Sequence, residues 1–230
     1  MEIKQYVQNK DIDKLISLKG KIFSKLQSLN SEERKIAWEA LNLIANSGSF
    51  EPSIKEKRYL RSLLWHSLRG VRDDAWKNLE LYKKFGIEGV ERTLTANSDK
   101  LKFSAWSNVI EMINLGFVSK EYVISVRNSF WRLLKSRIGT IRRKSWRLFI
   151  KLVSEGIFSL EDKERFKEFL RHRKINVRLY AWSAAMKLAE LGFISIEELE
   201  KEIEQILWIS KLKKRVGYKA RDILEKLKHM

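Results

Sequence analysis

The sequence predicts an all-α protein built from about six antiparallel helix pairs. Three observations support this prediction: a short phrase recurs along the chain, apolar residues after each copy keep helical spacing, and a glycine follows each run. The phrase is a basic residue, three variable residues and Trp. Its five copies are Arg34–Trp38, Arg72–Trp76, Lys102–Trp106, Arg142–Trp146 and Arg178–Trp182, and a degenerate sixth copy runs from Arg215 to Lys219. No strand-like alternation competes with this pattern.

The elements follow from the phrase in chain order. Successive tryptophans of the phrase are 38, 30, 40 and 36 residues apart, which sets the length of each pair. The second helix of a pair begins at the phrase, and a glycine suited to a left-handed helix end follows it at Gly48, Gly86, Gly116, Gly156 and Gly192. Ser159 with Asp162, and Ser195 with Glu198, predict capped starts for the first helices of the last two pairs. The expected pairs cover residues 9–47, 52–86, 88–115, 119–155, 160–191 and 196–227.

The repeated phrase resembles the HEAT-like repeat family. In that family the second helix of a repeat often opens with an apolar residue, Arg, two variable residues and Ala. Val71–Ala75 and Val177–Ala181 match this opening, and Ile141–Ser145 matches it with Ser in place of Ala. The resemblance covers nearly the whole chain. It implies a right-handed α-α superhelix, an α-solenoid, in which residues 1–230 form a single domain.

Positive charge is the most pronounced feature of the composition. The chain holds 47 Lys and Arg against 29 Asp and Glu, a formal net charge of +18. Residues 1–115 carry 20 basic and 15 acidic side chains, whereas residues 116–230 carry 27 and 14. Lys-rich proteins also occur in thermophiles, but there the two signs tend to balance in ion-pair networks. The imbalance makes a polyanion the first partner to consider.

The charge is concentrated where helices are expected to start. A helix N-terminus normally favours acidic residues, because the helix dipole places partial positive charge there. The second helices of the first three pairs follow this rule, but those of the last three pairs begin with runs such as Arg142–Lys144 and Lys213–Arg215. Free backbone N–H groups flanked by cations form a good phosphate site. Equivalent turns of a repeat array lie along one edge, so we expect these clusters to form one ridge.

Twelve residues are the predicted nucleic-acid contacts: Arg137, Arg142, Arg143, Lys144, Arg147, Arg171, Arg173, Lys174, Arg178, Lys213, Lys214 and Arg215. An alternative is that many of these cations form a solvated face. The first Arg of each copy is equally well explained as part of an arginine ladder that packs neighbouring repeats. The arginines concerned are Arg34, Arg72, Arg142, Arg178 and Arg215.

The tryptophans allow two interpretations. Arg and Trp four residues apart share a helix face, so Trp106, Trp146 and Trp182 could stack on the bases of a ligand. Packing between repeats is the preferred interpretation, because Trp182 borders an apolar stripe. The tryptophans of the first helices, Trp65, Trp131 and Trp208, are expected in the core.

Catalytic and metal-binding patterns are absent from the sequence. There is no Cys, and the three histidines, His66, His172 and His229, are far apart, so we expect no metal site and no cofactor. The chain is also similar in size and basic character to the HEAT-like alkylpurine DNA glycosylases, a resemblance that implies a role in DNA repair. That family places an Asp one helical turn after a Trp. Here the residues at that spacing are Asn42, Glu80, Ile110, Ile150 and Met186, so Glu80 is the one weak catalytic candidate.

The sequence therefore predicts a non-enzymatic protein that binds the phosphate backbone of duplex DNA or structured RNA. Two alternatives stay open: a scaffold for an acidic protein partner, and a glycosylase-like repair enzyme. No membrane span or secretory signal is visible, so a cytoplasmic monomer with no membrane partner is expected.

Overall fold

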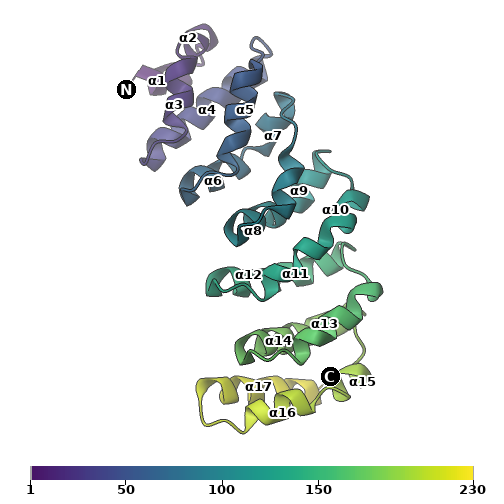
Figure 1. Ribbon diagram of the computed structural model, residues 1–230. Helices are drawn as coiled ribbons and strands as arrows, with labels where there is room; N and C mark the ends of the chain where they lie inside the picture. The colour runs from purple at the N-terminus through teal and green to yellow at the C-terminus, as the bar shows by residue number, and fades with distance from the viewer. Residues whose placement is uncertain (1, 230) are drawn as a thin grey trace. The chain divides into compact units, whose positions relative to one another are not determined.

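The computed structural model describes residues 2–229, and within them every regular element is a helix. This confirms the predicted all-α class. The chain divides into two compact units (Figure 1), which we call unit 1, up to Ser119, and unit 2, from Lys120 onward. Unit 1 carries 20 basic and 15 acidic residues, and unit 2 carries 27 and 14. The single domain over residues 1–230 stays a prediction.

Unit 1 contains nine α-helices and one 3₁₀ helix. The expected first helix of the third pair is the short 3₁₀ helix η1, and the second helices of the second and third pairs are each broken in two. The elements are α1 (Glu2–Asn9), α2 (Ile12–Ser17), α3 (Lys19–Lys25), α4 (Ser31–Ser47), α5 (Ile54–Leu63), α6 (Arg69–Trp76), α7 (Leu79–Lys84), η1 (Val90–Thr95), α8 (Asp99–Ser107) and α9 (Val109–Asn114).

Unit 2 alternates short helices with three long ones, α12, α14 and α17. The long helices begin within a few residues of the fourth, fifth and sixth copies of the phrase. The elements are α10 (Lys120–Val126), η2 (Arg127–Ser129), α11 (Trp131–Leu134), α12 (Gly139–Ser154), η3 (Leu160–Asp162), α13 (Lys163–Leu170), α14 (Ile175–Glu190), α15 (Ile196–Glu200), α16 (Glu204–Ser210) and α17 (Arg215–Lys228).

Helix ends and breaks have local causes. All five glycines expected to end helices adopt positive φ, from 59° at Gly86 to 71° at Gly192, as a left-handed helix end requires. The breaks fall at asparagines. The Nδ2 of Asn78 donates to the carbonyl of Asp74 (2.7 Å), and that of Asn108 donates to the carbonyl of Ser104 (2.7 Å). Such side chains compete with the backbone N–H for the same carbonyl, which favours a break. The same bond from Asn42 to the carbonyl of Trp38 nevertheless leaves α4 unbroken.

A hydrogen-bonded turn recurs before four of the helices that carry the phrase, and we call it the turn clamp. In each copy, the first Arg of the phrase donates to the carbonyl six residues earlier, at distances of 2.7–3.0 Å. The side chain of that same earlier residue accepts the backbone N–H two residues further on, at 3.1–3.2 Å. The pairs are Ser28 and Arg34, His66 and Arg72, Ser136 and Arg142, and His172 and Arg178.

Each clamp arginine also reaches a residue of the next expected helix pair. The Nε of Arg34 lies 2.7 Å from the carboxylate of Asp74, and the Nε of Arg72 donates to Ser104 (3.1 Å). In unit 2 the guanidinium of Arg142 lies over the Tyr180 ring at 6.0 Å, and Arg178 donates to the carbonyl of Gln205 (3.2 Å). The clamp therefore fixes the turn before a phrase helix and links that helix to the segment that follows.

Candidate nucleic-acid interface

Nine of the twelve predicted contacts have exposed side chains that form no ion pair within residues 2–229. We call these nine the basic ridge: Arg137, Arg143, Lys144, Arg147, Arg173, Lys174, Lys213, Lys214 and Arg215. All of them lie in unit 2, on the turns before α12, α14 and α17 or on the first three turns of these helices. Much of the net positive charge of unit 2 is therefore available to a binding partner.

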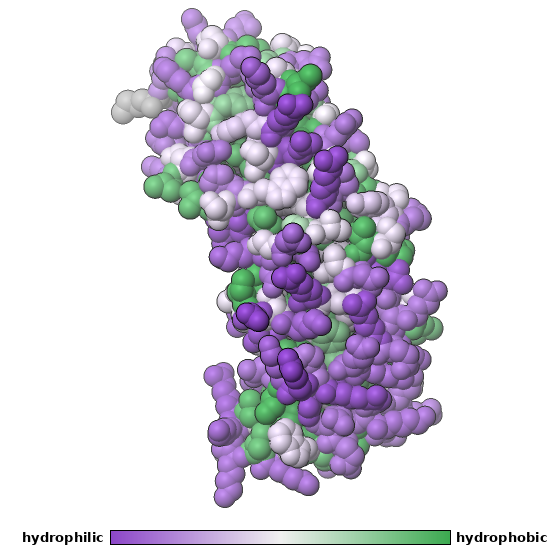
Figure 2. All heavy atoms as spheres, in the orientation of Figure 1, coloured by the Kyte–Doolittle hydropathy of each residue, from purple (hydrophilic) through white to green (hydrophobic). Residues whose placement is uncertain are grey.

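The three helices that carry the basic ridge are neighbours. Helix α12 packs against α14, and α14 packs against α17. In Figure 1 the turns that lead into them lie along one edge of unit 2, at the left of the view. Long hydrophilic side chains project along that edge near the turn between α16 and α17 (Figure 2). The fold thus brings three clusters that are separate in sequence to one side of the unit.

The starts of these helices lack the usual capping groups. The N-cap residues Ile138, Lys174 and Lys214 make no side-chain cap hydrogen bond, and no acidic residue occupies the first turn of any of the three helices. Helix α4 in unit 1 shows the usual arrangement, with Asn30 capping the backbone and Glu32 in the first turn. The expected acidic start is wrong for the second pair, because α6 begins at Arg69 with no side-chain cap and no acidic residue in its first turn. The uncapped N–H groups and nearby cations of unit 2 favour an anion.

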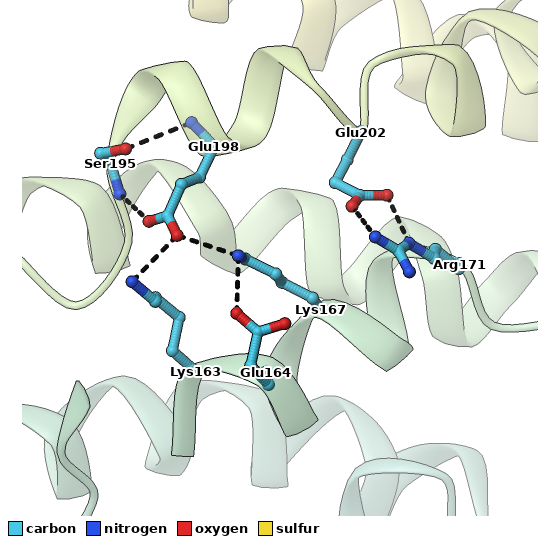
Figure 3. A network of polar contacts seen from close by, with 7 residues as sticks. All are labelled: Lys163, Glu164, Lys167, Arg171, Ser195, Glu198 and Glu202. Atoms are coloured by element: carbon cyan, nitrogen blue, oxygen red, sulfur yellow. Dashed lines mark hydrogen bonds and ion pairs between the residues drawn. The ribbon is translucent and has the colours of Figure 1, made fainter. Parts of the chain in front are cut away.

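The other three predicted contacts form hydrogen bonds within the protein. Arg142 and Arg178 are turn-clamp arginines, so their guanidinium groups already bind backbone carbonyls. Arg171 donates through Nε and Nη2 to both carboxylate oxygens of the buried Glu202, with 2.6 Å from Nε to Oε2 (Figure 3). These hydrogen bonds raise the pKa of Arg171 above its usual value. We therefore do not include these three in the basic ridge.

An ion-pair network beside Arg171 joins α13 to α15. The Nζ atoms of Lys163 and Lys167 each lie 2.9 Å from Oε1 of Glu198, and Lys167 also contacts Glu164 at 2.8 Å (Figure 3). Glu198 completes a capping box with Ser195, as the sequence predicts. The hydrogen bonds from Lys167 and Lys163, together with the Ser195 backbone N–H, lower the pKa of Glu198 to about 2. The network contributes to stability and pairs the cations Lys163 and Lys167 with carboxylates of the protein, so we do not include them in the basic ridge.

Replacing Glu198 by Gln is expected to flatten the acid dependence of stability. Because the pKa of Glu198 falls from 4.5 to about 2 on folding, its contribution is complete above pH 4.5 and is lost as the pH falls toward 2. Solvent screening limits that contribution to about 1 kcal/mol. Urea unfolding at pH 7 and at pH 3 measures it. The wild type should lose more stability than Glu198→Gln, and Glu200→Gln, at an exposed position on α15, should behave as the wild type does. Equal losses in all three proteins would refute the assignment.

The tryptophans of the phrase belong to the core. Trp106, Trp146 and Trp182 are at most 3% exposed, and each indole N–H donates to the carbonyl twelve residues earlier, at 3.0–3.2 Å. Their rings fill the space between helices, which is the packing role preferred from the sequence, and they offer no open face for stacking. Of the tryptophans expected on first helices, Trp131 is buried. The core prediction is wrong for Trp208, which is 53% exposed, and Trp65 is only partly buried, in the turn after α5.

Glu80, the weak catalytic candidate, is exposed on α7 in unit 1. Burial raises the pKa of the Glu111 carboxyl on α9, and the charge of Glu80 raises it further. Within residues 2–229 no three His, Asp or Glu side chains are grouped as a metal site would require. No helix in the same range is long and apolar enough to cross a membrane.

Two features of the structure were not predicted from the sequence. The first is the Ser or His six residues before each clamp arginine, a spacing that is visible in the four copies. The second is a pair of exposed aromatic residues near the last basic cluster, Trp208 and Tyr218. No sequence signal indicates that Trp208 is exposed, because it lies among apolar residues that are themselves buried.

Comparison with known proteins adds little to this description. No protein family model and no curated protein matches the chain. Among solved structures, the chain is similar to an engineered protein known from a crystal structure, with 18% sequence identity and a TM-score of 0.40. The match covers 91% of this chain and 96% of that one.

Proposed function

We propose that the protein is a HEAT-like α-solenoid, a right-handed superhelix of about six helix pairs, that binds the phosphate backbone of duplex DNA or structured RNA. Binding uses the basic ridge and involves no catalysis. The turn clamp supports the repeat assignment, since it recurs in four copies and each clamp arginine contacts the following segment of the chain.

One observation carries the ligand assignment: three adjacent helices present N-termini without side-chain caps, surrounded by the nine cations of the basic ridge. Cations at a positive helix end cost stability, by about 0.3–1 kcal/mol each where exposed. An anion removes that cost, because it accepts hydrogen bonds from the N–H groups and from the side chains together. A series of such sites along one edge suits a polymer with regularly spaced phosphates.

Equilibrium binding to equal lengths of duplex DNA, single-stranded DNA and folded RNA at 100 mM salt tests this proposal. We expect at least one form to bind with micromolar or better affinity, and binding that depends little on base sequence, because phosphate contacts carry no sequence information. Weak and equal binding of all three forms would overturn the proposal and favour an acidic protein as the partner of the ridge.

A further inference from the structure

Exposed aromatic residues are confined to the more basic half of the chain. Between residues 2 and 229 three aromatic side chains are exposed, namely Tyr122, Trp208 and Tyr218, and all belong to unit 2. Trp208 is 53% exposed and Tyr218 is 65% exposed, although the chain buries most of its other large rings wholly or in part. An exposed aromatic ring contributes little to the stability of the fold, so a ring held beside charged groups is a candidate for contact with a ligand.

Both rings lie at the turn that carries the last cluster of the basic ridge. Trp208 is two residues before the end of α16, and Tyr218 is in the first turn of α17. The residues between them include Lys213, Lys214 and Arg215. The two rings therefore lie on the two helices that flank these cations in the chain.

An arginine is held against each ring by its own hydrogen bonds. The guanidinium of Arg178 lies 5.9 Å from the Trp208 ring centroid, and the turn clamp and the carbonyl of Gln205 fix its position. The guanidinium of Arg221 lies 4.5 Å from the Tyr218 ring, and its Nη1 donates to the carbonyl of Ser210. Each guanidinium lies over one face of its ring, and Trp208 and Tyr218 remain more than half exposed.

We propose that Trp208 and Tyr218 form a stacking platform for unpaired nucleobases at this end of the basic ridge. The proposal rests on the proposed function and specifies its ligand: a nucleic acid whose phosphate backbone lies on the ridge and which offers a single-stranded segment beside the α16–α17 turn. Stacking on an aromatic ring tolerates any base and contributes about 1–3 kcal/mol per base, so the platform adds affinity without sequence specificity.

The test compares three ligands that differ only beyond a common duplex: a blunt end, a short single-stranded overhang, and an overhang of the same length built of abasic sites. The abasic overhang supplies the phosphates without the bases. The wild type should bind the base-bearing overhang about tenfold or more tightly than the abasic one. The double variant Trp208→Ala, Tyr218→Ala should lose this preference and bind the blunt duplex as the wild type does.

The conservative variant Trp208→Phe, Tyr218→Phe serves as the matched control and should retain the preference, since it keeps both rings. Thermal unfolding should be nearly unchanged in both variants, because both side chains are exposed. If the wild type binds the abasic and base-bearing overhangs equally, the platform is refuted while the ridge stands. If no ligand binds, the proposed function fails as well.

Discussion

A variant with four cations of the basic ridge reversed to Glu is expected to bind nucleic acid about a hundredfold or more weakly at 100 mM salt. The four residues are Arg143, Lys144, Lys174 and Lys214. If the ligand lies on the basic ridge, each substitution removes a phosphate contact and adds a repulsive charge near an uncapped helix start. Fluorescence anisotropy with labelled ligand measures the change. Stability should hold or rise slightly, because acidic side chains at helix N-termini are favourable.

A matched control separates the ridge from net charge. Unit 1 offers four exposed cations that form no ion pair with the described residues: Lys55, Arg58, Lys77 and Lys100. Reversing them to Glu changes the net charge by the same amount. If the ridge is the binding surface, this variant should lose much less affinity than the ridge variant. Equal losses would mean that binding follows total charge, and no loss in the ridge variant would place the ligand elsewhere.

Replacing Trp182 by Ala is expected to reduce the free energy of unfolding by about 3–5 kcal/mol, the usual cost of removing a large buried ring. The indole is fully buried and its N–H donates to the carbonyl of Leu170 (3.2 Å), so the variant leaves both a cavity and an unpaired carbonyl. Urea or thermal unfolding measures the loss. Trp208→Ala, at an exposed position, should change stability by less than about 1 kcal/mol.

The Trp182→Ala variant also distinguishes the packing and stacking interpretations of the tryptophans. Under the packing interpretation, Trp182→Ala weakens binding only to the extent that it unfolds the protein. A Trp182→Ala protein that is as stable as the wild type, yet binds nucleic acid poorly, would restore the stacking role that the sequence also allows.

Local signals explain why much of the fold is predictable from the sequence. The left-handed helix ends follow from glycine alone, and the starts of α12, α14 and α17 follow from a phrase that recurs near the same place in each helix. The basic ridge is predictable for the same reason: equivalent positions of a repeat come together on one edge. The runs of residues 127–151, 169–188 and 211–221 contain no acidic side chain, and the ridge lies within them.

The features that escaped prediction depend on contacts between distant residues. Arg171 differs from its neighbour Arg173 only because Glu202, 31 residues later, lies against it. The breaks at Asn78 and Asn108 coincide with an amide that competes for one particular carbonyl, and α4 tolerates the same bond at Asn42, so periodicity does not reveal which helix breaks. Trp208 occupies an apolar run like the buried tryptophans, but the rest of unit 2 leaves it 53% exposed.

The salt dependence of binding tests the central claim most directly. If the ligand lies on the basic ridge and about six or more phosphates are neutralised, the affinity for duplex DNA should fall by roughly 10³–10⁵ between 50 and 200 mM salt, and the ridge variant should show a clearly shallower slope. An affinity that hardly changes over this range, or a slope that is the same in the wild type and the ridge variant, would contradict the account.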